Sequence, residues 1–275
     1  MRYPPQMRLG AWVSLHLLAL IAVLPAAWAR DRGADGEFNE RQSIHFRLHQ
    51  DVDIDNYSGA GGSRQFEVSV LEILENAYGS VGRRLGVRPR TRTEVWVYDP
   101  VVFDQRFKDS FRFQAAGFFN GAIHVRGGSR VDAQLVRTLH HEYVHAAFEA
   151  EDPSFVIPAF ANEGIAEWFE NLAVGKRTLS LGERRVLETV AAQGKLLPLG
   201  KLKRTGFASV PADYAGLAYL QSYATIDHLV KTRGERSLRT FVDEIFRSRS
   251  LTRALERSFG LKEHELEAEL RSALR

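Results

Sequence analysis

The sequence of 275 residues contains no cysteine. Without thiols the chain can form no disulfide, and it can build no zinc site from thiolate ligands. An oxidising compartment would therefore neither help nor harm its fold.

Long apolar runs are also missing. The apolar stretch near the N-terminus covers the 14 residues 11–24, whereas a helix needs about 20 apolar residues to cross a bilayer. Two arginines precede this stretch, and the small residues Ala27 and Ala29 follow it. Residues 1–29 are therefore predicted to be an export signal that is cleaved after Ala29. The product would be periplasmic or secreted, with no stable membrane span.

An excess of charge of either sign is lacking as well. Removing residues 1–29 takes away two of the 37 basic residues and none of the 34 acidic ones, which leaves a net charge close to +1. The basic clusters at 201–204 and 247–250 are interpreted as solvated loop and helix-end charges. A nucleic-acid partner is therefore not expected.

No internal repeat and no low-complexity linker divides the chain. Its length suits one large domain or two closely packed subdomains. The residue pattern changes at Gly127-Gly128, after which almost every segment has helical spacing. We therefore expect an α+β fold. A small N-terminal mixed sheet with a helix, residues 30–127, would pack against a mainly helical half, residues 128–275.

Four segments of the N-terminal half have a clear pattern. Residues 43–50 and 93–98 are rich in strand-forming side chains, and both are predicted to be strands. Residues 66–85 have apolar positions at helical spacing and predict a helix. Residues 117–126 predict a hairpin closed by an Asn-Gly turn, with its second strand at 122–125.

Residues 129–150 predict one long helix. Ser129 and Asp132 form a capping box at its start. An apolar stripe along it supports the helical period: Val131, Leu135, Leu139 and Ala146. The sequence HEYVH at residues 141–145 therefore lies in the middle of a helix.

The HEYVH sequence has the spacing of a metal site. Side chains four positions apart on a helix share one face, so His141 and His145 point at one place and can hold a zinc ion. Glu142 lies about 100° further round the helix, where its carboxylate can reach a water molecule without taking a ligand position. A base beside a Lewis acid indicates hydrolysis.

A zinc hydrolase usually needs a third protein ligand. Pro158 can open a second helix, on which Glu163 and Glu167 lie one turn apart on the same side. Glu163 is the candidate third ligand, and Glu167 and Asn162 are candidates to support the ligands. Gly164 is expected to let the two helices approach closely enough to share one ion.

Simpler interpretations of these residues stay open. The two histidines could only pack or cap, and Glu163 could be an ordinary surface acid. His140 adjoins the motif, but it points about 100° away from His141 and cannot share a face with His145 as well. It is interpreted as a supporting or surface residue.

These residues resemble the gluzincin metallopeptidases, and most closely the peptidase-MA-like families of bacterial zinc peptidases. The likeness is carried by HEYVH at 141–145, PAFANEGIAEWF at 158–169 and AYLQSY at 218–223, in that order. It covers nearly the whole chain after the signal. The resemblance implies a zincin-like fold in which Glu163 is the third zinc ligand. It also implies that Glu167 is the acid that orients a zinc-bound histidine.

Peptide hydrolysis also needs a donor for the oxyanion. Tyr219 and Tyr223 are the candidates, because they lie four apart on a helix expected from 213 to 231 and both can face the metal. The resemblance places a tyrosine in this block, and we rank Tyr219 first. Buried tyrosines mostly just pack, so either residue could be structural instead.

In gluzincins a sheet edge beside the metal helix pairs with an extended peptide. The strand at 122–125 is expected either to be such a free edge, to which a peptide main chain can add, or to be a core strand without one. Both alternatives fit the sequence equally well.

The sequence thus predicts an exported hydrolase of peptide bonds in peptides or proteins, with one zinc ion per chain and Glu142 as the general base. One alternative is a periplasmic binding or assembly protein with a structural zinc ion. Glu142 argues against it, because a structural site is closed by four protein ligands and gains nothing from an unpaired carboxylate. Another is a zinc hydrolase of a non-peptide cell-wall amide or ester, which would share every residue of the site.

Overall fold

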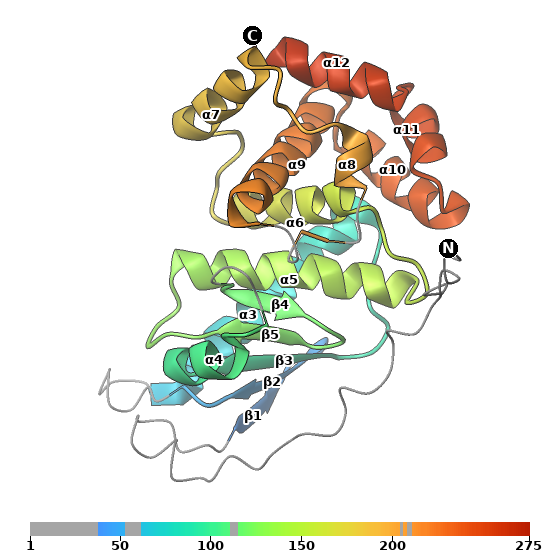
Figure 1. Cartoon of the computed structure of the whole chain (residues 1–275). Helices are drawn as coiled ribbons and strands as arrows, with labels where there is room; N and C mark the ends of the chain where they lie inside the picture. Colours follow the sequence, from blue (N-terminus) through green and yellow to red (C-terminus); the bar gives the residue numbers. More distant parts are fainter. Residues whose placement is uncertain (1–37, 53–61, 111–114, 204–205, 208–210) are drawn as a thin grey trace, which may run out of the picture.

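The computed structural model describes residues 38–52, 62–110, 115–203, 206–207 and 211–275 (Figure 1). The predicted export signal, residues 1–29, lies outside these ranges. Among the helices that are described, none combines the length and the apolar character needed to cross a bilayer.

The described strands form one five-stranded mixed sheet in the order β1-β2-β3-β5-β4. They are β1 (Asn39–Gln42), β2 (Phe46–Gln50), β3 (Thr93–Tyr98), β4 (Gly117–Phe119) and β5 (Ile123–Arg126). β2, β3 and β5 are parallel, and β1 and β4 pair antiparallel at the two edges.

The predicted strand at 93–98 and the predicted hairpin at 117–126 are confirmed. The predicted strand at 43–50 begins only at Phe46, and β1, which precedes it, was not predicted. β5 lies between β3 and β4, so of the two alternatives for residues 122–125 the core strand is confirmed and the free edge is wrong. The edge strand on this side of the described sheet is β4, the first strand of the hairpin.

The two faces of the sheet differ in what covers them. Its inner face carries buried apolar side chains from the three parallel strands: Phe46, Leu48, Val95, Val97, Ile123 and Val125. This face packs against α3 (Gly62–Leu85) and α5 (Ala133–Glu151). On the outer face, the rings of Tyr98 and His124 contact phenylalanines of α4 (Pro100–Phe107).

The described elements after α5 are all helices, and they lie on the other side of α5 from the sheet (Figure 1). Its helices are α6 (Ala159–Ala173), α7 (Leu181–Ala192), α8 (Leu199–Leu202), α9 (Ala212–Arg233), α10 (Glu235–Ser248), α11 (Leu251–Phe259) and α12 (Glu263–Ala273). α6 packs against both α5 and α9. One continuous hydrophobic core includes Phe46 of β2, Tyr143 of α5 and Phe241 of α10, so both halves of the chain bury their apolar side chains together.

The helix that carries the histidines starts later than predicted. Asp132 has an extended backbone, and its carboxylate accepts a hydrogen bond from the Leu135 N–H at 2.9 Å. Asp132 is therefore the N-cap, and the predicted capping box from Ser129 is wrong. His141 and His145 still lie in the middle of α5, as predicted.

Candidate metal centre

His141 and His145 of α5 converge on Glu163 of α6. The Nε2 atom of His141 lies 3.4 Å, and that of His145 3.5 Å, from the same carboxylate oxygen of Glu163. All three side chains are largely buried, with exposed fractions of 11–14%. The predicted meeting of two imidazoles and one carboxylate is confirmed, and this group could hold a metal ion.

The other nitrogen of each imidazole has its own partner. His141 Nδ1 lies 2.9 Å from Glu170 Oε2, and His145 Nδ1 lies 3.1 Å from Asn162 Oδ1. A neutral imidazole that donates from Nδ1 has its lone pair on Nε2, the atom that faces Glu163. Both rings are therefore held in the orientation that metal binding needs, and Asn162 supports His145.

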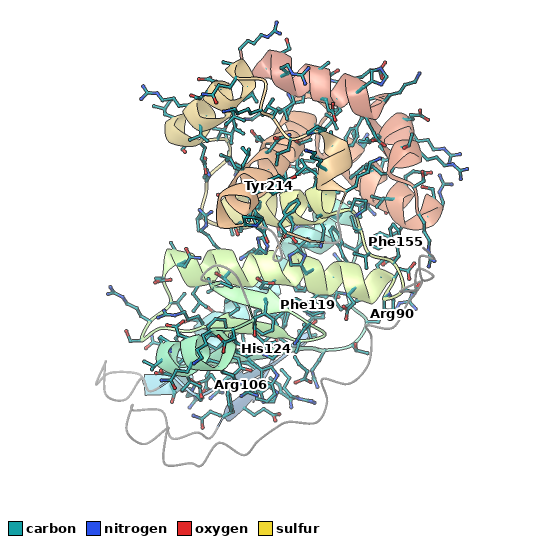
Figure 2. The ribbon with its side chains drawn as sticks, in the orientation of Figure 1. Arg90, Arg106, Phe119, His124, Phe155 and Tyr214 are labelled. Atoms are coloured by element: carbon teal, nitrogen blue, oxygen red, sulfur yellow. The ribbon has the colours of Figure 1, made fainter. Side chains whose placement is uncertain are left out.

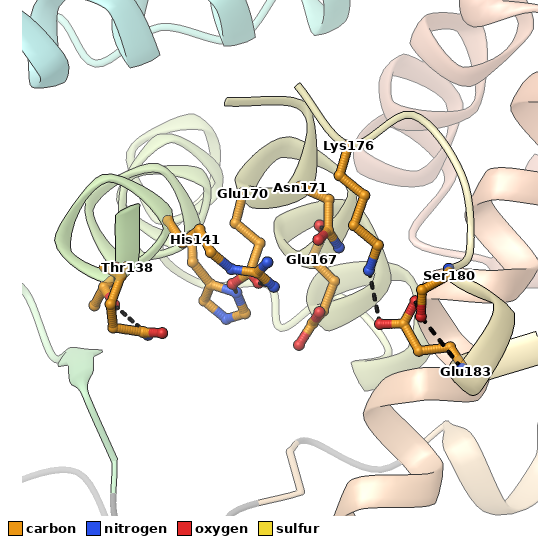
Figure 3. A network of polar contacts seen from close by, with 10 residues as sticks. Thr138, His141, Glu167, Glu170, Asn171, Lys176, Ser180 and Glu183 are labelled. Atoms are coloured by element: carbon orange, nitrogen blue, oxygen red, sulfur yellow. Dashed lines mark hydrogen bonds and ion pairs between the residues drawn. The ribbon is translucent and has the colours of Figure 1, made fainter. Parts of the chain in front are cut away.

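The structure places Glu170, and not the predicted Glu167, on His141. Figure 3 shows Glu170 beside the His141 ring, and its second oxygen accepts from Arg137 Nη2 at 2.5 Å. Glu163, Glu167 and Glu170 occupy positions i, i+4 and i+7 of α6, so they share one face. Counting one more turn along the sequence would have found Glu170.

The charges at this group favour a bound cation. Burial alone would raise the pKa of Glu163, but the two imidazoles lower it to about 2. Burial lowers the pKa of His141 and His145, and the nearby carboxylates, Glu163 first among them, more than reverse that effect. The carboxylates thus favour positive charge between them, which a bound metal ion would supply.

Glu142 lies next to the group without joining it. Its side chain is buried, and it lines the same cavity as the two histidines. Burial raises the pKa of its carboxyl, against the opposing effect of His141 and His145. A raised pKa makes the carboxylate a stronger base, which suits a group that takes a proton from water.

A cavity of about 570 Å³ opens over these residues. Its floor is α5, one wall is β4 with the residues before it, and the other is α6 with the loop at 152–157. Figure 2 labels Phe119 on the sheet side of α5 and Phe155 near its C-terminal end, and both line the cavity. The cavity therefore lies between the edge strand and the helical half.

Gly117 lets the edge strand approach the helix that carries the histidines. A Cβ atom at this position would lie 2.6 Å from Thr138 Cγ2 on α5 and 3.0 Å from the His124 carbonyl oxygen. Any side chain there would push β4 away from α5. The missing side chain brings the edge strand to the rim of the cavity.

Gly164 has a different role from the predicted one. A Cβ atom there would lie 2.6 Å from the Ser222 carbonyl oxygen and 2.8 Å from Ile226 Cγ1, and both atoms belong to α9. The close approach at Gly164 is therefore between α6 and α9, not between α6 and the helix with the histidines. The prediction identified the right residue and the wrong neighbour.

Tyr219 and Tyr223 both lie on α9, but they differ in what they face. Tyr219 lines the cavity, and burial and the carboxylates of Glu163 and Glu142 raise its pKa. Tyr223 is 1% exposed, does not line the cavity, and has a buried hydroxyl without a hydrogen-bond partner among the described residues. Tyr219 is thus the tyrosine that could reach a molecule bound in the cavity.

His140 does not compete for a metal ion. It is buried, and its Nδ1 lies 2.9 Å from the Val136 carbonyl oxygen one turn earlier in α5. It is not among the residues that line the cavity. His140 was interpreted as a supporting or surface residue, and because its side chain is buried, the surface alternative is wrong.

The site thus combines three convergent donors, a buried acid beside them and an open cavity over them. No family model matches the chain, and no curated protein matches it either.

Proposed function

We propose that this chain is an exported, zinc-dependent metallopeptidase. The observation that carries the proposal is the convergence of His141 Nε2 and His145 Nε2 on one oxygen of Glu163, at 3.4 and 3.5 Å. Two ligand atoms about 2.0–2.1 Å from a tetrahedral zinc ion lie about 3.3 Å apart. The spacing of the three donors therefore suits zinc, and two nitrogens with one carboxylate oxygen are a usual ligand set of catalytic zinc.

The three donors would leave one coordination position of a tetrahedral ion free. Among the described residues the donor group has three members, so a tetrahedral ion would keep one position for water or substrate. A zinc ion held there would act as a Lewis acid and would lower the pKa of a water molecule from about 16 towards about 7. A structural site, by contrast, would be closed by a fourth protein ligand.

Glu142 would act as the general base. From its buried position in the cavity it would take a proton from the attacking water and later give it to the leaving amine. The raised pKa of its carboxyl suits both transfers. Tyr219 would donate its hydroxyl hydrogen to the oxyanion that forms when water attacks the peptide carbonyl.

The edge strand is the feature that favours a peptide over another amide or ester. β4 ends the described sheet and borders the cavity at residues 117–119. An extended peptide could add to the main chain of β4, and its carbonyl would then face the metal centre. The resemblance to the gluzincin metallopeptidases supports the same choice, and the predicted signal at residues 1–29 supports export.

The test measures zinc content and cleavage of a mixed peptide library by the mature chain, by Glu142→Gln and by Glu163→Ala. Glu142→Gln should keep zinc and lose turnover by several orders of magnitude, because the ligands stay and the base is gone. Glu163→Ala should lose zinc, because it removes a ligand.

Two results would refute the proposal. Zinc in the wild-type chain without cleavage of any peptide would favour a binding or assembly protein. Cleavage that survives in Glu142→Gln would mean that another residue is the base. A third result, hydrolysis of cell-wall amides or esters but not of peptides, would keep the centre and change the substrate.

A further inference from the structure

Glu167 is not one of the three candidate ligands of the metal centre, His141, His145 and Glu163. Glu170 contacts His141, and Glu163 is the candidate ligand that both histidines face. Glu167 lies close to His141 and Glu170 in a second group of possible ligand atoms, but it is not part of the group that contains both histidines. Its carboxylate has no hydrogen-bond partner among the described residues, and it lines the cavity. Figure 3 shows it extending beside His141, and one of its oxygens lies within 4.8 Å of a His141 nitrogen.

Glu167 forms no ion pair among the described residues, although the positive charges of His141 and Arg137 act on its carboxylate from further away. No lysine or arginine is among the described residues that line it, whereas six carboxylates are: Glu142, Glu149, Asp152, Glu163, Glu167 and Glu170. Glu170 is paired with Arg137, and Asp152 is paired with Arg249. Glu149 is exposed at the rim, where solvent screens its charge.

A metal ion would not remove this imbalance. The two positive charges of a zinc ion would be balanced by Glu163, which holds it, and by Glu142 beside it. Glu167 would remain the carboxylate on this face of α6 that neither the ion nor an arginine pairs with. A carboxylate in such a place is stabilised by a cation that comes with the substrate.

We propose that Glu167 binds a cationic group of the substrate, a primary ammonium or a guanidinium, beside the metal centre. This inference rests on the proposed peptidase function and names its substrate class. The cation could be the free N-terminus of a peptide or the side chain of a lysine or arginine. Both sources present the same chemistry to Glu167, and the arms of the experiment separate them.

The experiment uses one peptide sequence in matched forms. Lysine or the uncharged norleucine stands at each position that flanks the cut, and each peptide has either a free or an acetylated N-terminus. kcat/KM is measured with the zinc-loaded wild-type chain, and binding is measured by calorimetry with zinc-loaded Glu142→Gln. The same measurements are made after Glu167→Gln is added to each protein.

We expect the wild-type chain to prefer the charged form of one peptide pair by about 10- to 100-fold, which is the range for a hydrogen bond to a charged group. Glu167→Gln should abolish this preference, so that the charged and uncharged peptides of a pair are cleaved alike, and it should keep its zinc. Glu167→Asp should keep part of the preference. Glu149→Gln, which removes the same charge from the exposed rim, should keep most of it.

A preference that depends on the free N-terminus assigns Glu167 to the α-amino group, and one that depends on lysine assigns it to a side chain. Three results would overturn the inference: no charge preference in the wild type, an equal preference in Glu167→Gln, or loss of zinc from Glu167→Gln. Failure of the proposed function has a different outcome. Glu142→Gln would then bind charged peptides through Glu167, while the wild-type chain would cleave none.

Discussion

The two sides of α6 carry different residues and make different contacts. The side that faces α5 and the cavity carries Glu163, Glu167 and Glu170 within two turns. The side that faces α9 approaches so closely that a Cβ atom at Gly164 would lie 2.6 Å from a backbone oxygen. One helix thus has a polar contact that converges on the histidines and a close contact that leaves no room for a side chain.

We expect the side of α6 that faces the cavity to serve function and the side that faces α9 to serve stability. Three carboxylates on one helix face repel one another, and burial together with Glu170 raises the pKa of Glu167 to about 7. That face is therefore a poor source of folding free energy. The contact with α9 supplies the packing that holds the acids in place. We expect mutations on the two sides of α6 to change different measured quantities.

The largest effect is expected at Gly164. Gly164→Ala would place a methyl group against the Ser222 carbonyl oxygen and Ile226, so either α6 or α9 must move. Overpacking of this kind lowers the free energy of unfolding by about 1–3 kcal/mol, and a backbone neighbour points to the upper part of that range. Denaturant unfolding of the metal-free chain measures it.

Gly182→Ala is the matched control. Gly182 lies in α7, and a Cβ atom there meets nothing within 4 Å. Alanine should stabilise that helix by up to about 1 kcal/mol, because it has the higher helix propensity. Equal stability of the two variants would show that the contact between α6 and α9 relaxes freely, and the contrast between the two sides of α6 would fail.

Local features of the site could be predicted from the sequence, and features that depend on distant segments could not. Helical spacing is local, so the position of His141 and His145 on one face, and that of Glu163 on the next helix, followed from residue numbers alone. Strand order is not local. The sequence could not show that β5 pairs with β3 on one side, which leaves β4 as the edge.

Contacts between residues on different helices were the other feature that was predicted wrongly. Gly164 was read correctly as a point of close approach, but its partner is α9, more than 50 residues further along the chain. The role of Glu167 was assigned from a resemblance, and the contact with His141 is made by Glu170, one turn later. Side-chain spacing predicted which residues share a face, and only the packed helices decide which of them makes the bond.

The next effect is expected on the other side of α6, in metal binding. Glu170→Gln keeps an oxygen that can accept from His141 Nδ1, but it removes the charge that connects this ring to Arg137. Loss of such a supporting partner weakens metal affinity by about 10- to 100-fold. Competition with a zinc chelator measures the affinity.

The stability of the metal-free chain is the control for Glu170→Gln. Arg137 is 29% exposed on its side chain, so water can solvate it and the free energy of unfolding should change little. A fall in stability as large as that of Gly164→Ala, with unchanged zinc affinity, would reverse the assignment.

The smallest effect is expected at Asn162, which supports the second histidine with a neutral group. Its Oδ1 lies 3.1 Å from His145 Nδ1, a longer contact than that between Glu170 and His141. A hydrogen bond between neutral groups contributes about 0.5–1.5 kcal/mol, so Asn162→Ala should weaken zinc affinity by about tenfold or less.

The same chelator assay measures this effect, with Asn162→Asp as the matched variant. The aspartate would give His145 the charged partner that His141 already has, so its zinc affinity should equal or exceed that of the wild type. If Asn162→Ala were as damaging as Glu170→Gln, the charge of Glu170 would have no special part in holding the metal, and the two imidazoles would be supported alike.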